Sequence, residues 1–257
     1  MQRSDAVELL AVPGIPLVAK DDDLAAMIGE GVTRGGLVPR GGDVFVLAQK
    51  IVSKAEGRMV DLATVKPSTE AIELAGKVQK DPRLVELILS ESVRVVRSRP
   101  GVLIVEHRLG LVMANAGIDQ SNVGSPDEAR RALLLPDDPD GSAAMLRKRL
   151  SQRFGVPIAV IISDSFGRAW RRGTCGIAIG AAGLPSLIDL RGQPDLFGRT
   201  LEVSIIGFAD EIAAAASLLQ GQAAEAQPVI LVRGLDWSAP IAPAAELVRP
   251  PEEDLFR

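Results

Sequence analysis

Short apolar runs of strand length recur along the chain and limit what it can fold into. The clearest are residues 44–49, 156–163 and 228–234, which are rich in β-branched residues. Runs of this length suit buried strands, and none approaches the roughly 18 apolar residues that a membrane helix needs. An earlier run, 7–12, stops at Pro13 before the core of a secretory signal could form. We therefore expect a cytoplasmic protein without a membrane segment.

The order of the expected elements indicates the fold class. Residues 92–98, 102–108 and 111–115 follow one another like the strands of a meander, whereas other strands alternate with helices. Helices are expected over 69–77, from Pro82, over 143–154 behind a Ser142 cap, and from Asp210, with a further strand at 201–207. This mixture predicts an α+β fold with mixed or antiparallel sheets and flanking helices. We expect one unit over residues 1–237 and a surface-bound or frayed tail at 238–257.

The composition excludes several classes of function. The chain has 29 basic and 33 acidic residues, a net charge of −4, so no overall positive field attracts nucleic acid. Its one cysteine, Cys175, rules out an internal disulfide and a cysteine-based zinc cluster. The one histidine, His107, rules out a multi-histidine metal site, and we expect it to be a surface or paired residue. Any catalysis must therefore depend on carboxylates, amides, lysine and arginine.

A first polar cluster follows the expected strand at 111–115. Residues 115–123 read NAGIDQSNV and place Asp119 among amides and small residues. Oxygen ligands of this kind suit a hard cation such as Mg²⁺ or Mn²⁺. The alternative is a turn, which Asn and Asp favour on their own account.

A second cluster follows the strand at 156–163, where open sheets usually display their sites. Asp164 and Ser165 could bind a metal ion, and three arginines follow within a few residues, Arg168, Arg171 and Arg172. Guanidinium groups bind phosphates and carboxylates, so the pattern predicts a polyanionic ligand. A solvated basic loop is the alternative. Lys54, after the strand at 44–49, could add a point charge on a phosphate or could be a solvated surface lysine.

The chain resembles the coenzyme F-420:γ-L-glutamyl ligase family in segments that occur in order between residues 14 and 234. They are GIPLVAKDDDL, GDVFVLAQKIVSKAEGR, MANAGIDQSNV, LLLPDDPDGSA, ISDSFGRAWRRGTCGIAIG, DLFGRTLEV, ADEIAAAA and PVILVRG. Strings such as NAGIDQSNV and DGSA are unusual, which makes the resemblance specific.

The resemblance implies a fold and a reaction. The fold would be two-lobed, and the protein would work as an intertwined homodimer with sites near the subunit interface. The reaction would add L-glutamate through an amide bond to the lactyl carboxylate of the deazaflavin F-420 precursor. GTP would drive it through an acyl phosphate, with Mg²⁺ or Mn²⁺ bound and K⁺ a further candidate ion. Such phosphoryl transfer depends on positioning and charge neutralisation and needs no histidine.

The resemblance also assigns roles to residues. Asp119, Asp164 and Ser165 match metal-binding positions, with Ser165 where threonine is usual. Lys54, Arg168, Arg171 and Arg172 would act on phosphates or substrate carboxylates. The positions that match nucleotide contacts are Ile15, Pro16, Leu17, Val18, Gln49, Lys54, Asn122, Gly221 and Gln222.

The chain departs from the family pattern in the segment that follows Gly221. Gln222 replaces an acidic residue and Ala226 a glycine, and Gln49 replaces a small hydroxyl residue of some relatives. A second metal ion and the preference for GTP depend on that segment. Two alternatives therefore stay open: a ligase for another carboxylated cofactor of the folate or pterin type, and a non-catalytic nucleotide-binding subunit.

Overall fold

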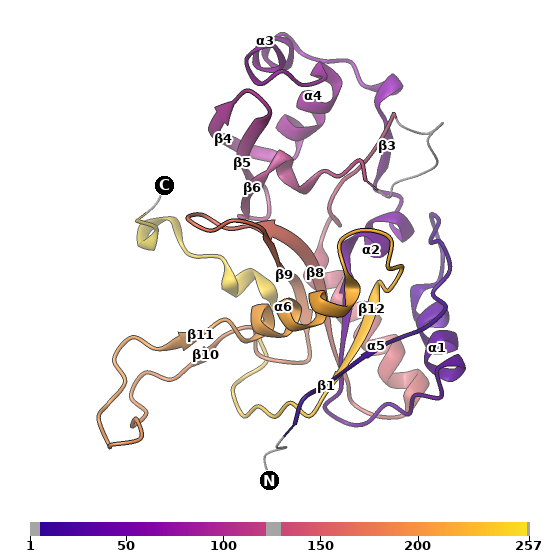
Figure 1. Ribbon diagram of the computed structural model, residues 1–257, viewed down its shortest axis with the longest axis vertical. Coiled ribbons are helices and arrows are strands. Elements are labelled where there is room, and N and C mark those ends of the chain that lie inside the picture. Colours follow the sequence, from indigo (N-terminus) through magenta and orange to yellow (C-terminus); the bar gives the residue numbers. More distant parts are fainter. Residues whose placement is uncertain (1–5, 122–129, 256–257) are drawn as a thin grey trace.

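A five-stranded mixed sheet forms the centre of the computed structural model, which describes residues 6–121 and 130–255 (Figure 1). Its strand order is β1-β12-β2-β8-β9, and β2 and β8 are parallel neighbours whereas the other pairs are antiparallel. The mixed sheet with flanking helices confirms the predicted α+β class. The strands are β1 (Glu8–Ala11), β2 (Val44–Ala48), β8 (Ala159–Gly167), β9 (Thr174–Ala182) and β12 (Val229–Arg233).

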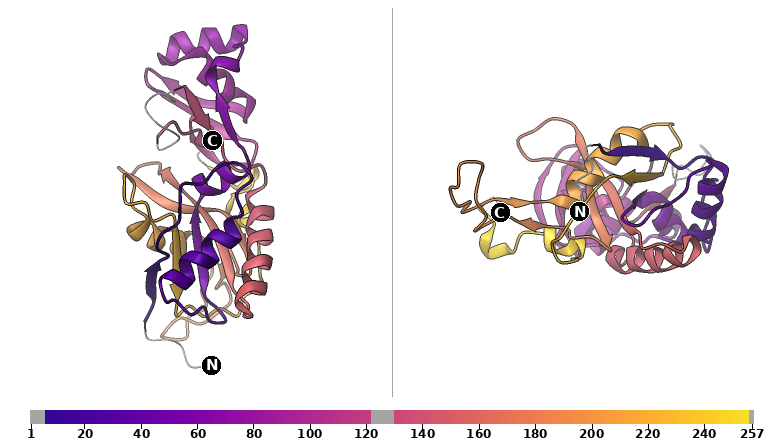
Figure 2. Two further views of the ribbon diagram at one scale, coloured as in Figure 1. Left: turned by 90° about the vertical axis from the view of Figure 1, so that its right-hand side faces the viewer. Right: turned by 90° about the horizontal axis from the view of Figure 1, so that it is seen from below.

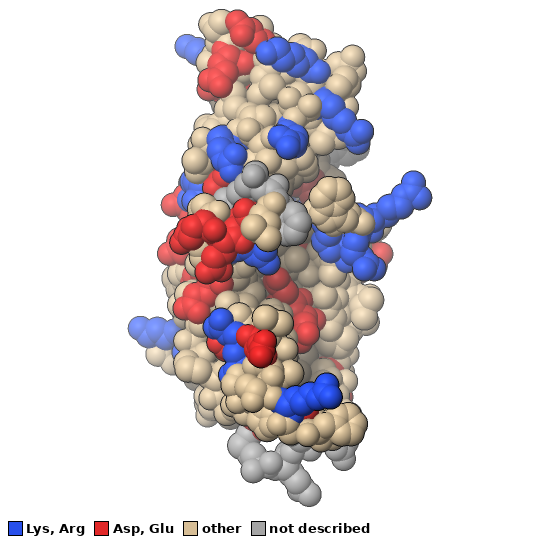
Figure 3. Space-filling model, turned by 90° about the vertical axis from the view of Figure 1, so that its left-hand side faces the viewer, with Lys and Arg blue, Asp and Glu red and all other residues tan. Residues whose placement is uncertain are grey.

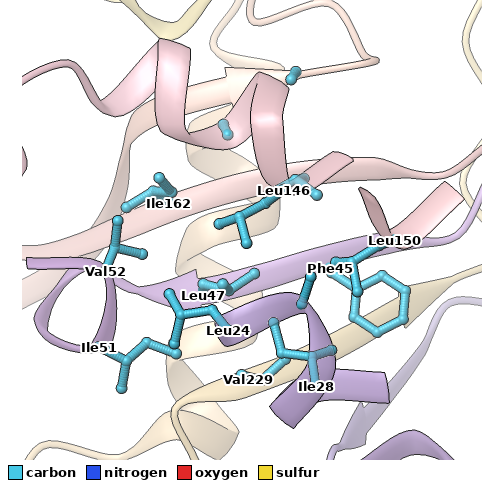
Figure 4. Close-up of a cluster of buried hydrophobic side chains, with 14 of the residues drawn as sticks. Leu24, Ile28, Phe45, Leu47, Ile51, Val52, Leu146, Leu150, Ile162 and Val229 are labelled. Carbon is cyan, nitrogen blue, oxygen red and sulfur yellow. The ribbon is translucent and has the colours of Figure 1, made fainter. Parts of the chain in front are cut away.

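Helices cover both faces of this sheet because its strands are apolar on both sides. Phe45 and Leu47 pack with α1 (Leu24–Arg34) and α5 (Pro139–Phe154), which lie side by side in Figure 2. Figure 4 shows this cluster, with Leu24 and Ile28 of α1 facing the strand residues. The alternate residues of β2 pack instead against α6 (Phe208–Gln220). Two-sided burial explains why the strand sequences read as continuous apolar runs.

A separate hydrophobic cluster lies in residues 59–134, at the top of Figure 1. Here α3 (Thr69–Val78) and α4 (Pro82–Ser90) pack beside the antiparallel sheet β4-β5-β6. The predicted meander is therefore confirmed, as are the helix starts at Ser68 and Pro82. The strands of this part are β4 (Ser92–Arg99), β5 (Val102–His107) and β6 (Val112–Ala114), with the pair β3 (Met59–Asp61) and β7 (Arg131–Leu133).

Two sequence predictions about local structure are wrong. The helix expected behind Ser142 begins at Pro139, because Asp138 caps it and proline fits the first turn. The Ser142 hydroxyl instead donates to the Glu56 carboxylate. The strand expected at 201–207 is reduced to β11 (Ile205–Ile206), which pairs with β10 (Ile188–Asp189). Val203 is 86% exposed, since only Ile205 and Ile206 of this segment pair with another strand.

The tail after Ser238 is bound to the surface of the protein. Ala244 is buried, and the Asp140 carboxylate accepts hydrogen bonds from the backbone N–H groups of Ala244 and Ala245. The Ser186 hydroxyl donates to the Pro243 carbonyl. Two short 3₁₀ helices, Ala244–Leu247 and Pro251–Glu253, follow along the body.

Glu91 is the centre of a partly buried charge cluster that links the end of α4 to the rest of the chain. Its Oε2 lies 3.0 Å from Arg58 Nη2, 3.2 Å from Arg108 Nε and 3.5 Å from Nε2 of the fully buried His107. Burial by itself would raise the pKa of Glu91, but His107 and the two guanidinium groups outweigh it and lower the pKa to about 2. His107 is fully buried, which excludes the surface position that the sequence also allowed, and its Nδ1 accepts a hydrogen bond from the Leu109 backbone N–H at 3.0 Å.

We expect Glu91→Gln to lower the free energy of unfolding by about 1–2 kcal/mol at neutral pH, because the partly exposed Arg58 and Arg108 lose the carboxylate that they share. A depressed carboxyl pKa stabilises the fold above the ordinary value of 4.5, and this stabilisation is lost as the pH falls toward 2. Between pH 7 and pH 3 the free energy of unfolding, measured with urea, should therefore fall less in the variant than in the wild type. Asp236→Asn, at an exposed position outside this cluster, is the control and should change little. If the free energy of unfolding depended on pH equally in the wild type and in Glu91→Gln, the stabilising role of the ionised Glu91 carboxylate would be contradicted.

Gly180 allows α5 to pack directly on β9. A Cβ at this position would overlap the backbone carbonyl of Pro139, which cannot move without shifting the helix. We expect Gly180→Ala to destabilise the protein by about 2–3 kcal/mol, measured by urea unfolding. Gly76→Ala is the matched control: Gly76 lies inside α3 with open space around it, so alanine should stabilise by about 1 kcal/mol. A neutral Gly180→Ala would mean that α5 and β9 are less tightly packed.

Candidate active site

A cavity of about 300 Å³ lies at the carboxyl ends of β2 and β8. These strands are parallel neighbours, so the residues that follow them meet at one edge of the sheet. An N-terminal loop and the segment after α6 close the other sides. Its lining includes residues 15–18, 48–51, Lys54, 163–165, Gly176, Ser217 and 220–228.

The short helix α2 (Gln49–Ala55) starts directly after β2 and provides one wall. Gln49 is buried, and its Oε1 accepts a hydrogen bond from Ser53 Oγ at 2.8 Å. Lys50 and Lys54 are four residues apart and thus lie on the same side of the helix. Burial lowers the pKa of Lys54, and the charge of Lys50 lowers it further. The wall therefore presents two ammonium groups, which suits an anionic ligand.

Asp164 enters the site from β8. The register of β8 against β9 shifts between Ile162 and Ser163, and such an irregularity re-aims the side chains that follow. Burial raises the pKa of the Asp164 carboxyl to about 7, and the charge of Asp119 also raises it. The Ser165 backbone N–H and the Gln49 side-chain amide oppose this by favouring the charged form. A cation beside Asp164 would therefore stabilise its carboxylate strongly.

Asp119 reaches the same site from a different part of the chain. The turn before it has φ values of +53°, +53° and +68° at Asn115, Ala116 and Gly117, and a bridge to Leu133 then fixes Asp119. Its Oδ2 lies 2.7 Å from Lys50 Nζ. Burial by itself would raise the pKa of Asp119, but Lys50 and the Ser121 backbone N–H lower it. Two carboxylates from distant segments thus share one lysine.

The structure brings most of the sequence-predicted site residues to this cavity. Asn122 lies outside the described residues. Arg168, Arg171 and Arg172 are exposed where β8 turns into β9 and do not line the cavity. The predicted residues that line it are Ile15, Pro16, Leu17, Val18, Gln49, Lys54, Asp164, Ser165, Gly221 and Gln222, with Asp119 joined through Lys50.

Sequence reasoning missed several polar residues of the cavity, among them Lys50 and Gln220. Lys50 could have been found from its spacing of four from Lys54 on one helix. Gln220, in the last turn of α6, had no comparable signal. Its Oε1 accepts from Ser163 Oγ at 3.3 Å, whereas its buried Nε2 has no hydrogen-bond partner within the described residues. A buried amide donor of this kind requires an acceptor, which a ligand could supply.

The segment after α6 differs from the expected sequence pattern at Gln222 and Ala226, but it still has a defined backbone conformation. Ala226 has a φ of +54°, in the left-handed region that favours glycine, so alanine is accommodated at a cost of about 1 kcal/mol. Gln222 Oε1 accepts a hydrogen bond from Ser165 Oγ at 2.8 Å. The glutamine therefore stays next to the candidate metal residues.

The donor set fits a hard cation. Asp119 and Asp164 offer carboxylates, Ser165 a hydroxyl and Gln222 an amide oxygen, all of which suit Mg²⁺ or Mn²⁺. The described part of the chain contains no group of three or more acidic, histidine or cysteine side chains that could hold a metal ion. Oxygen atoms of water and of the ligand would therefore complete the coordination.

Comparison with known proteins decides the family. The sequence model of the F420-0:Gamma-glutamyl ligase family matches residues 14–234, which is most of the chain and includes every lining segment of the cavity. The chain belongs to this family. It is therefore an enzyme of the ligase class.

Curated relatives match the chain over nearly its whole length. The coenzyme F420:L-glutamate ligase of Methanothermobacter thermautotrophicus is 45% identical over 253 residues, covering 98% of this chain and 99% of the relative. Its counterpart in Methanopyrus kandleri is 42% identical and covers 96% and 98%. The enzyme of Archaeoglobus fulgidus is also 42% identical, with coverage of 98% and 96%.

In the described ranges, none of the helices has the length and apolar character to cross a bilayer.

Proposed function

We propose that this protein adds L-glutamate through an amide bond to the lactyl carboxylate of the coenzyme F-420 precursor, using GTP and Mg²⁺ or Mn²⁺. The observation that carries the proposal is that Asp164, Lys50 and Lys54 line one cavity, while Asp119 forms an ion pair with Lys50 at 2.7 Å. Carboxylates bind the cation and ammonium groups bind the anionic phosphates, so the cavity suits a metal–nucleotide complex. The names of the relatives support the choice of acceptor and of glutamate.

The reaction we propose has two steps. A carboxylate oxygen of the acceptor takes the γ-phosphoryl group of GTP, and GDP is released. The glutamate amine then attacks the acyl carbon, the bond between that carbon and the phosphate oxygen breaks, and phosphate and a proton leave. Neither step needs an enzyme nucleophile, which agrees with the placement of Cys175 outside the cavity lining.

The residues of the site would act by charge and position. The bound cation would neutralise negative charge on the phosphates, held by Asp119, Asp164 and Ser165. The Lys54 ammonium is partly buried, and a cation in such surroundings attracts a phosphate oxygen more strongly than one in water. The free Nε2 of Gln220 would donate to a ligand oxygen. Backbone groups of 15–18 and 221–222 would surround the nucleotide.

We propose further that the protein works as a homodimer built through the arm, which we define as residues 188–206. The arm begins and ends at the β10–β11 pair and projects from the body (Figure 1). Its tip exposes Leu196 (93%) and Phe197 (87%) to solvent. Exposed apolar side chains on an extended segment usually mark a protein contact. Acidic and basic side chains are interspersed on the face that carries the arm (Figure 3), which favours small-molecule and protein partners over nucleic acid.

The direct test is turnover of purified protein with the F-420 precursor, L-glutamate, GTP and Mg²⁺ or Mn²⁺. We expect phosphate release and a product heavier by one or more glutamyl units in the mass spectrum. Parallel reactions with a folate or a pterin acceptor separate the proposed function from a related ligase. GTP binding without turnover on any acceptor would indicate a non-catalytic nucleotide-binding subunit and contradict the proposal. Replacing GTP by ATP tests the choice of nucleotide.

A further inference from the structure

Lys50 occupies a cage of oxygen atoms next to the two site carboxylates. Its Nζ lies 2.7 Å from Asp119 Oδ2, 3.0 Å from Ser121 Oγ and 3.3 Å from the Ser121 carbonyl oxygen. An ammonium group has three N–H donors, so these three acceptors satisfy it completely. Lys50 is thus bound in a defined place and is not a solvated surface lysine.

The cage has the composition of a cation site. A carboxylate, a hydroxyl and a backbone carbonyl are ligand types of hard divalent cations, and Asp164 contributes a second carboxylate whose charge interacts with both Asp119 and Lys50. One ammonium therefore neutralises a pair of carboxylates that would otherwise repel each other. The other oxygen of the Asp119 carboxylate, Oδ1, accepts a hydrogen bond from the Ser121 backbone N–H at 2.6 Å, so a divalent cation would compete with Lys50 for Oδ2.

The Lys50 side chain is able to leave this position. It is 28% exposed and lies in the first turn of α2, where the backbone is held by the buried Gln49 while the four-carbon side chain can rotate. Lys50 also lines the cavity together with Lys54. An ammonium released from Asp119 would therefore face the space in which we place the nucleotide phosphates.

We propose that Lys50 is a built-in competitor of the divalent cation: its ammonium must leave Asp119 before the cation can bind there, so Lys50 sets the cation affinity of the site. The inference rests on the proposed function, since it assumes the cation site at Asp119 and Asp164. It makes Lys50 a positioning residue whose release couples the binding of a cation to the arrival of an anionic ligand.

The test is Mn²⁺ binding to the purified protein without nucleotide, followed by the electron paramagnetic resonance signal of free Mn²⁺. Lys50→Met removes the competing charge and keeps most of the side-chain volume. We expect it to bind Mn²⁺ about tenfold more tightly than the wild type. Lys50→Arg keeps the charge and the reach, and its affinity should stay near that of the wild type. In the double variant Asp119→Asn with Lys50→Met the gain should disappear.

A second readout separates competition from a change in folding. Without Mn²⁺ the Lys50→Met variant should melt at a lower temperature than the wild type, and saturating Mn²⁺ should raise its melting temperature more. Unchanged or weaker Mn²⁺ binding by Lys50→Met, with normal binding by the wild type, would overturn this inference and leave the metal site in place. Absence of Mn²⁺ binding by all variants and the wild type would overturn the metal site itself, and the role of Lys50 with it.

Discussion

Asp164→Asn should abolish ligase activity, with a loss of about a thousandfold or more in turnover, while the protein stays folded. The asparagine has nearly the same shape but cannot provide a charged ligand to a cation. Because burial already raises the pKa of Asp164 to about 7, replacing this carboxyl by a neutral amide removes little that the fold depends on. The melting temperature without metal should therefore change little or increase. Activity is measured as the glutamyl product, and folding by circular dichroism.

Asp119→Asn should cause a comparable loss of activity by a different route, since it removes the carboxylate that pairs with Lys50. Asp236→Asn is the matched control, because Asp236 is exposed and lies outside the cavity lining.

Full activity of Asp164→Asn in saturating Mg²⁺ would contradict the metal assignment. Activity lost together with the circular dichroism signal would show that the carboxylate is needed for folding instead.

The sequence predicts the strands of the central sheet and one half of the site, because the apolar runs and the polar residues at their ends can be recognised in it. The runs that become β2 and β8 are apolar on both faces, and polar residues where these runs end, Gln49 and Asp164, are site residues. Where two such strands are parallel neighbours, their carboxyl ends lie at the same edge of the sheet. The sequence does not show that β2 and β8 are neighbours, because more than a hundred residues separate them and the pairing depends on the whole fold.

Other features depend on tertiary contacts that no local pattern contains. Asp138 and Ser142 are both acceptable helix caps, and the choice between them follows from Pro139 and from the Glu56 carboxylate that holds Ser142. The run at 201–207 has the alternation of a strand, but only Ile205 and Ile206 pair, in a two-stranded sheet with β10. The ion pair of Lys50 with Asp119 joins residues far apart in sequence, so spacing could indicate the lysine but not its partner.

Replacing Leu196 and Phe197 by serine should convert the proposed homodimer into monomers at micromolar protein concentration. Both side chains are almost fully exposed at the tip of the arm, and burial against a second subunit would remove their apolar surface from water. Each would then contribute roughly 1.5–3 kcal/mol to association, enough for a change of several orders of magnitude in the dissociation constant. Sedimentation equilibrium of the wild type and the double variant measures the change.

The unfolding free energy of the monomer should not change, because neither side chain contributes to a core of the described chain. Val38→Ser is the control: Val38 is 71% exposed but lies on the body outside the arm, so this variant should remain dimeric. A wild type that sediments as a monomer, or a double variant that dimerises as strongly as the wild type, would contradict the assignment of the arm. If the dimer is lost together with ligase activity while Mn²⁺ binding persists, the second subunit is needed for a step after cation binding.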